Sequence, residues 1–159
     1  MEDYRSKIKS LEKAKKEIDR LKSERKRVVF TNGCFDILHP GHTRYLHAAR
    51  QLGDHLVVAV NSDKSVRAIK GEGRPILSQD ARMELLAALS FVDTVVIFEE
   101  DNPLKVIRYL TPNILVKGGD WKEEEIIGAH VVKNKGGEVV RIPYISGFST
   151  TEILKKVKK

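Results

Sequence analysis

Two histidines three residues apart, His39 and His42, are the side chains of this sequence best suited to chemistry. They follow an apolar run, 28–30, that is typical of a buried strand, and they precede a helical pattern. The first amides of a helix are unpaired donors at the positive end of its dipole, so an anion is favoured there. Both imidazoles can donate N–H groups to phosphate oxygens, and Gly41 lets a phosphate approach the backbone. The pattern predicts a triphosphate site that supports attack on phosphorus with release of pyrophosphate.

The same histidines could instead be structural residues or metal ligands. A zinc site is disfavoured, because no Cys or Glu lies at ligand spacing beside the pair. The single cysteine, Cys34, permits no internal disulfide, which is typical of proteins of the reducing cytoplasm. We interpret Cys34 as a packing residue rather than a nucleophile, because phosphoryl transfer of this kind needs no covalent intermediate.

Five apolar runs separated by helical patterns predict an α/β fold, with a Rossmann-like, doubly wound parallel sheet of five strands. The carboxyl ends of parallel strands meet at the ligand crevice of such a sheet. Asn32 and Gly33 follow the first run, and Asn61 and Asp63 follow the second, so we expect all four residues at this crevice. The five runs begin near Val28, His55, Thr94, Ile114 and Glu138.

A glycine-interrupted loop, 70–75, carries two cations, Lys70 and Arg74. It could be an ordinary charged loop at the surface. The alternative is a flap that closes over bound substrate and brings the Lys70 ammonium to the phosphates, where it would stabilise the transition state. We favour the flap and expect a catalytic role for Lys70.

The fourth run leads into a double-glycine turn, Lys117-Gly118-Gly119-Asp120. Backbone groups exposed by the two glycines can bond the edge of a base or a sugar. Trp121 follows the turn and can either stack on a ligand or cover the core, and we favour the core.

The last helical pattern begins at Ser149-Thr150-Thr151-Glu152. Ser149 and Glu152 have the spacing of a capping box, which explains both residues structurally. The three hydroxyls of 149–151 also lie at a helix N-terminus, where they suit triphosphate oxygens. We expect this helix start and the one after His39 to line one pocket.

These segments together resemble a known family. The run Phe35-Asp36-Ile37-Leu38-His39-Pro40-Gly41-His42 is similar to the signature of the cytidylyltransferase-like nucleotidyltransferases, which have the HxGH fold, and 149–151 resembles their Ser-Thr-Thr motif. The longer run from Thr31 to His39, with 60–63 and 117–120, resembles the adenylyltransferase domain of bacterial ADP-heptose synthases. The resemblance covers about 27–157. Tyr144 is a departure, because the related glycerol-phosphate cytidylyltransferases carry an arginine there.

The resemblance implies transfer of an adenylyl group from ATP to D-glycero-D-manno-heptose 1-phosphate, giving ADP-heptose for lipopolysaccharide core synthesis and pyrophosphate. The catalytic residues would be His39, His42 and Lys70. The nucleotide contacts would be Asn32, Gly33, Phe35, Gly41, Arg82, Lys117, Gly118, Gly119, Asp120, Ser149, Thr150 and Thr151. The contacts to the sugar phosphate would be Asp36, Asn61, Asp63 and Arg74.

Mg²⁺ would accompany ATP, and we predict no metal ligand from the protein. The family also occurs fused to a sugar kinase, so we expect a separate heptose 7-phosphate kinase as the pathway partner. Two alternatives remain. The first is another cytidylyl- or adenylyltransferase, acting on glycerol 3-phosphate or phosphopantetheine. The second is a non-enzymatic module that binds nucleotide or RNA.

The formal net charge of +7 raises the question of a nucleic-acid partner. Residues 1–27 hold 11 basic and 6 acidic residues, and 155–159 hold four lysines, whereas 28–154 hold 14 basic and 16 acidic residues. Because the basic excess lies at the two ends, we expect no nucleic-acid partner. No apolar run approaches the ~20 residues that span a bilayer, and the charged N-terminus is no secretory signal, so we expect a cytoplasmic protein without membrane contact.

Residues 1–27 predict one amphipathic helix, because apolar residues recur at spacings of three and four. We divide the chain into this N-terminal helix, 1–26, and a nucleotidyltransferase domain, 27–159. The helix is expected to dock on the core or on a second subunit of a homo-oligomer, such as a dimer. Its apolar positions are Met1, Tyr4, Ile8, Leu11, Ile18 and Leu21.

Overall fold

The computed structural model describes residues 1–119, 121–143 and 147–158. These residues form a five-stranded sheet with the order β3-β2-β1-β4-β5, and all neighbouring strands are parallel. The chain runs outward from β1 to β2 and β3, then returns to β4 on the other side of β1. This order confirms the predicted doubly wound α/β class. The strands are β1 (Val28–Gly33), β2 (His55–Asn61), β3 (Thr94–Phe98), β4 (Ile114–Gly118) and β5 (Glu138–Ile142).

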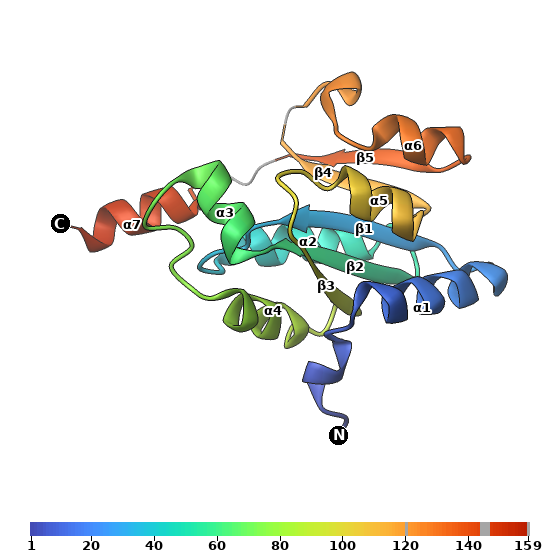
Figure 1. Cartoon of the computed structure of the whole chain (residues 1–159), viewed down its shortest axis with the longest axis horizontal. Helices are drawn as coiled ribbons and strands as arrows, with labels where there is room; N and C mark the ends of the chain where they lie inside the picture. Colours follow the sequence, from blue (N-terminus) through green and yellow to red (C-terminus); the bar gives the residue numbers. More distant parts are fainter. Residues whose placement is uncertain (120, 144–146, 159) are drawn as a thin grey trace.

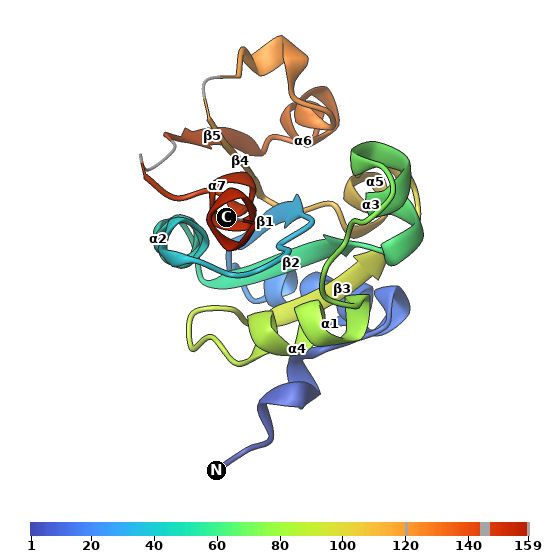
Figure 2. The ribbon, with the colours of Figure 1, turned by 90° about the vertical axis from the view of Figure 1, so that its left-hand side faces the viewer.

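Helices cover both faces of the sheet, as Figures 1 and 2 show. Alternate strand residues point to opposite faces, so Val28 and Phe30 belong to one apolar cluster and Val29 to the other. The first face packs against α1 (Leu11–Ser23), α5 (Leu104–Leu110) and α6 (Ala129–Asn134). The second packs against α2 (Pro40–Arg50) and α4 (Gln79–Ala87). In Figure 1, α3 (Asp63–Lys70) and α7 (Thr150–Val157) lie beyond the carboxyl ends of the strands.

The N-terminal segment differs from the single helix predicted over 1–27. A short 3-10 helix, η1 (Tyr4–Lys7), is followed by a bridge between Ile8 and Val95 of β3, and α1 begins only after Ser10. The Ser10 hydroxyl accepts the Lys13 amide at 3.2 Å, so the helix starts at this cap. The prediction of one helix was wrong because the pattern of apolar residues did not reveal the bridge to β3. The helix does dock on the core, where Ala14 and Ile18 are buried.

Two other helical segments also differ from the sequence pattern. Residues 63–70 form the helix α3, which we had not predicted, and Lys70 is its last residue. The helix predicted from Glu123 to Lys133 is instead a 3-10 turn, η2 (Glu123–Glu125), followed by α6. Gly128 lies between them at φ 89°, a left-handed conformation that interrupts a continuous helix. In the parts of the chain that the structure describes, no helix has the length and apolar content needed to cross a bilayer.

Candidate active site

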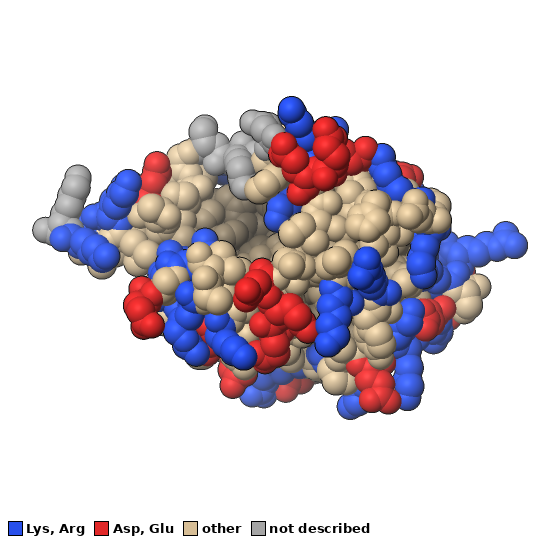
Figure 3. Space-filling view, turned by 45° about the horizontal axis from the view of Figure 1, so that its top comes forward, with Lys and Arg blue, Asp and Glu red and all other residues tan. Residues whose placement is uncertain are grey.

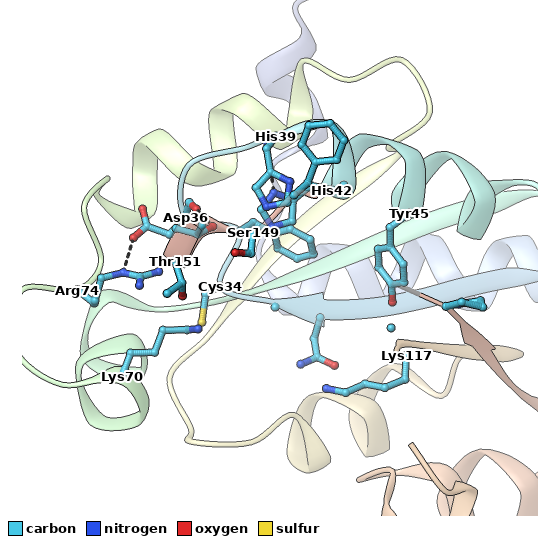
Figure 4. A pocket seen from close by; sticks show the side chains of 18 residues that line it. Cys34, Asp36, His39, His42, Tyr45, Lys70, Arg74, Lys117, Ser149 and Thr151 are labelled. Carbon is cyan, nitrogen blue, oxygen red and sulfur yellow. Dashed lines mark hydrogen bonds and ion pairs between the residues drawn. The ribbon is translucent and has the colours of Figure 1, made fainter. Parts of the chain in front are cut away.

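A cavity of about 490 Å³ opens where the strand order reverses between β1 and β4. This switch point at the carboxyl ends of the strands is the usual ligand site of a doubly wound sheet. Figure 4 shows its side chains, and Figure 3 shows a hollow on this side of the molecule with Lys and Arg at its edge. Fourteen of the predicted site residues line it: Asn32, Gly33, Phe35, Asp36, His39, Gly41, His42, Lys70, Arg74, Lys117, Gly118, Ser149, Thr150 and Thr151.

The first turn of α2 positions the two histidines. His39 is the residue that caps the helix, in an extended conformation, and Pro40 occupies its first position. The His39 backbone amide donates to Nδ1 of His42 at 3.3 Å, and the two rings stack with centroids 3.8 Å apart. Since Nδ1 of His42 accepts this bond, a neutral His42 carries its proton on Nε2 and can donate it to a ligand.

The surroundings of both imidazoles favour the neutral form by lowering the pKa of each ring. Burial and the neighbouring His39 lower the pKa of His42 to about 4. Burial also lowers the pKa of His39. Nδ1 of His39 is buried and has no hydrogen-bond partner among the described residues. The pair therefore offers uncharged N–H donors, and a bound polyanion would raise both pKa values by favouring the protonated rings.

The start of α7 adjoins the start of α2 at the cavity. Ser149 caps the helix, and its hydroxyl accepts the Glu152 amide at 3.0 Å, as the capping pattern predicted. Ser149 and His42 line the same cavity, which confirms the predicted convergence of the two helix starts. The Thr150 hydroxyl donates to the Asp36 carbonyl at 2.7 Å, and this hydrogen bond holds α7 beside the β1–α2 loop.

Asp36 connects this loop to the segment that follows α3. Its carboxylate accepts from Arg74 Nε at 3.1 Å and from the amides of Ile76 at 2.7 Å and Leu77 at 3.0 Å. Burial works to raise the pKa of Asp36, but the bonds from Ile76, Leu77 and Arg74 outweigh it and the pKa lies below its usual value. Asp36 thus holds the 74–77 segment at the cavity, and this shared carboxylate was not evident from the sequence.

Four predicted ligands among the described residues do not line the cavity, and a buried cluster around Arg82 accounts for three of them. Its side chain is 0% exposed, and its guanidinium donates to the carbonyls of Leu77, Cys34 and Asn61 at 2.7–3.1 Å. It also pairs with Asp63 Oδ1 at 2.9 Å. Contrary to the prediction, Arg82 has no face toward a nucleotide, because a buried guanidinium must satisfy its donors inside the protein.

Asn61 and Asp63 share this buried cluster. Asn61 is nearly buried and donates from Nδ2 to Ser65 Oγ at 3.0 Å, while Asp63 is paired with Arg82. These contacts fix the end of β2 rather than present polar groups to the cavity. Gly119 also lies outside the lining, because its amide bonds the Ile142 carbonyl of β5 at 2.9 Å. Asp120 and Tyr144, both singled out from the sequence, lie outside the described residues.

Four lining residues were not assigned to the site from sequence: Cys34, Tyr45, Pro143 and Phe148. Tyr45 lies one helical turn after His42, so the helical spacing could have indicated it. Its hydroxyl lies 2.7 Å from Thr31 Oγ1. Phe148 directly precedes Ser149, and its ring is partly exposed beside His39.

Lys117 is a half-buried cation at the end of β4. Burial lowers its pKa. Its ammonium lies 5.4 Å from the centroid of the Trp121 ring. Trp121 is 41% exposed, so our interpretation of this ring as a cover of the core was wrong. The lining of the cavity thus brings together the cations Lys70, Arg74 and Lys117, with Asp36 as its one carboxylate among the described residues.

These donors do not form a protein site for a metal. Among the described residues there is no group of three or more His, Cys, Asp or Glu side chains that could hold a metal ion. The Asp36 carboxylate is already bonded to three donors. Phosphate oxygens of a bound polyanion and water are the ligands that a divalent cation such as Mg²⁺ commonly takes.

The chain belongs to the cytidylyltransferase-like family, whose model matches residues 30–156. This match confirms the resemblance drawn from the His39–His42 signature. The chain is also similar to one part of two bifunctional HldE proteins. That of Citrifermentans bemidjiense is 52% identical over 98% of this chain and 32% of its own length. That of Nitrobacter hamburgensis is 57% identical over 82% of this chain and 27% of its own length. The chain thus spans about a third of the length of these curated relatives.

Two solved structures share the fold. A lipopolysaccharide core biosynthesis protein from Thermoplasma volcanium is 29% identical, with a TM-score of 0.59 over 76% of this chain and 97% of that one. Pantoate-beta-alanine ligase from Francisella tularensis, solved with beta-gamma ATP and beta-alanine, has a TM-score of 0.61 over 95% of this chain and 76% of that one. At 15% identity, the second likeness concerns the fold alone.

Proposed function

We propose that this chain transfers the adenylyl group of ATP to D-glycero-D-manno-heptose 1-phosphate, with ADP-heptose and pyrophosphate as products. The observation that carries the proposal is the convergence of two helix N-termini, α2 and α7, on one cavity lined by three cations. Two positive helix ends and three cations match the charge of a triphosphate beside a sugar phosphate. The similarity to HldE proteins over nearly the whole chain supports the choice of substrates.

In this reaction an oxygen of the sugar phosphate attacks the α-phosphorus of ATP. A new P–O bond forms as the bond to the β-phosphate breaks, and pyrophosphate leaves with the electron pair. His42 donates from Nε2 and His39 lies stacked against it, so their N–H groups can stabilise charge on the phosphoryl oxygens. Figure 4 shows Lys70 and Lys117 on opposite sides of the two histidines. Both ammonium groups add positive charge to the cavity.

Mg²⁺ is proposed to enter bound to ATP, where it neutralises phosphate charge. The chain itself orients the substrates, because the bond from Thr150 to the Asp36 carbonyl holds the start of α7 beside the β1–α2 loop, and the Asp36 carboxylate holds the 74–77 segment at the cavity. The proposal also places the protein in the cytoplasm and requires a heptose 7-phosphate kinase to supply the sugar phosphate. The homo-oligomer expected from the N-terminal helix stays a prediction.

Pyrophosphate release tests the proposal directly. ATP and CTP are each combined with heptose 1-phosphate, glycerol 3-phosphate and 4′-phosphopantetheine, and the product is identified by mass. We expect turnover with ATP and heptose 1-phosphate alone. Turnover of CTP with glycerol 3-phosphate would instead assign a cytidylyltransferase. No turnover with any pair, together with salt-dependent RNA binding, would assign a nucleic-acid-binding module.

A further inference from the structure

Several contacts of the described residues hold the start of α7 against the α2 side of the cavity. The helix itself has no buried residue, so the core does not fix its position. One contact is the hydrogen bond from Thr150 to the Asp36 carbonyl. Another is made by the ring of Phe148, which lies nearly parallel to the His39 ring, with 6.2 Å between centroids and 16° between planes. This geometry is within the range of offset aromatic pairs.

The Phe148 ring belongs to a continuous stack at the cavity. His39 stacks on His42 with centroids 3.8 Å apart, and His42 meets the Phe35 ring edge-on at 5.5 Å. On the outer side, Cζ of Arg44 lies 5.7 Å from the Phe148 centroid. The stack therefore runs from an exposed guanidinium to the buried Phe35, and it joins residues of both helix starts.

The packing around this stack leaves little room for movement. A Cβ atom at Gly41 would lie 2.8 Å from Cε1 of His39 and 3.2 Å from Cβ of Phe148. The backbone at Gly41, the His39 ring and Phe148 are thus in close contact, and a shift of one would displace the others.

We propose that Phe148 is a positioning residue that holds the His39 imidazole against His42 and sets the two helix N-termini at the spacing one triphosphate requires. The inference rests on the proposed function. A phenyl ring offers no hydrogen bond to a phosphate, so its influence on the bound phosphates passes through His39 and the adjoining Ser149. The residue is therefore distinct from the histidines, which would touch the phosphates themselves.

The state of His39 gives a readout that does not depend on turnover. Its Nδ1 is buried without a partner among the described residues, and burial lowers its pKa. Removal of the Phe148 ring would let water reach the imidazole and would raise this pKa toward 6.5. The ionisable groups of the stack are His42 on the inner side of His39 and Arg44 beyond Phe148.

The experiment compares Phe148→Ala, Phe148→Leu and Phe148→Tyr in the full chain, with Tyr109→Ala as a control. Tyr109 is an aromatic residue of similar exposure on α5, away from the cavity lining. Three quantities are measured: the pKa of His39 by NMR, the Kd of a non-hydrolysable ATP analogue, and KM for each substrate. For Phe148→Ala and Phe148→Leu we expect Kd and KM for ATP to rise roughly 2- to 12-fold, the range for loss of one aromatic pair. The His39 pKa should rise, KM for the sugar phosphate should stay unchanged, and Phe148→Tyr should restore all values.

Unchanged ATP affinity and an unchanged His39 pKa in Phe148→Leu would overturn the inference. So would a loss of ATP affinity in Phe148→Tyr equal to that in Phe148→Leu, because the aromatic ring would then be irrelevant. If Phe148→Ala does not fold, the Leu and Tyr variants decide. A shifted His39 pKa and weakened ATP analogue binding, without any adenylyl transfer by the wild-type chain, would leave this inference standing and reject the proposed function.

Discussion

The two ends of the sheet carry the same kinds of side chain with opposite consequences. At the amino ends of β2 and β3, the Glu17 carboxylate contacts His55 Nε2 at 3.2 Å and also binds Lys9 and the Thr94 hydroxyl. Burial works to raise the pKa of Glu17, but the bonds from His55, Lys9 and Thr94 hold it at about 2. The charged and polar groups of this cluster pair with one another, and the contacts of Glu17 hold α1 against the sheet.

At the carboxyl ends the charges do not cancel. Lys70 and Lys117 line the cavity, while the Asp36 carboxylate is bonded to Arg74 and two backbone amides. The His39 Nδ1 atom has no partner among the described residues. The comparison shows that the types of residue present do not by themselves identify a binding site. Hydrogen-bond donors and positive charges that have no partner within the protein indicate one, because a ligand must then supply the acceptors.

The largest effect is expected for His42→Ala, which removes a hydrogen-bond donor from the cavity at the carboxyl ends of the strands. We expect turnover to fall by ~10²-fold or more, on the scale of one lost transition-state donor. The measurement is pyrophosphate release at saturating ATP and sugar phosphate. His47→Ala is the matched control, because His47 is exposed on the same helix and its ring meets Phe91 instead. Equal turnover of His42→Ala and wild type would remove His42 from the mechanism.

Glu17→Gln should affect only the paired cluster at the amino ends of β2 and β3. The amide cannot accept the bonds of the carboxylate equally well, so we expect the free energy of unfolding to fall by about 1–3 kcal/mol with turnover unchanged. Urea unfolding at pH 7 measures the change, and Glu12→Gln, on the exposed face of α1, is the control. A loss of turnover without a loss of stability would contradict the structural role.

Lys70→Gln should weaken the reaction less than the histidine variant does. Loss of one charged donor predicts that kcat/KM falls roughly 10-fold, without a change in the urea midpoint. Lys105→Gln is the matched control, because Lys105 is an exposed residue of α5 that pairs with Glu100. Should Lys105→Gln reduce kcat/KM as much as Lys70→Gln does, a general charge effect would replace the proposed contact.

The smallest expected effect is a change in the free energy of unfolding with pH, which occurs in a different pH range for each end of the sheet. The pKa of His42 is about 4 in the folded chain and about 6.5 when it is unfolded, so unfolding takes up a proton between these values. The free energy of unfolding should therefore fall as pH is lowered from 6.5 to 4, with His39 adding in the same direction. The contribution of Glu17 is complete above its unfolded pKa of 4.5 and should be lost as pH falls through 2, with Asp36 adding there.

Urea titrations over this pH range check the assignment. His42→Gln should flatten the upper part of the profile, and Glu17→Gln should flatten the lower part. If His42→Gln leaves the slope between pH 6.5 and 4 intact, the lowered pKa of His42 is refuted. Addition of the ATP analogue should raise the His42 pKa and reduce the upper slope, because a bound polyanion favours the protonated ring.

The predictable parts of the site are those with local signals. His39, Gly41 and His42 form a contiguous turn, and Ser149 begins a helix with a capping pattern, so their chemistry could be read along the chain. The parallel sheet then requires both turns at the same edge. The predicted ligands that lie outside the cavity lining had no such local signal, and Arg82 shows why. Arg82 lies on a helix near the crevice, but the direction of its side chain depends on carbonyls of three other segments.

The sequence by itself determined the fold class, the succession of the five strands along the chain and the two helix starts that meet at the cavity. Those features follow from apolar periodicity, from glycine and proline positions and from capping residues, which act over a few neighbours. Only the tertiary structure decided which polar groups are paired with other groups of the protein and which face the cavity. Arg82 and Glu17 are paired within the protein, whereas Lys70 and the His39–His42–Phe148 stack lie at the cavity. Pairing depends on distances between segments far apart in the chain, and no local pattern encodes those distances.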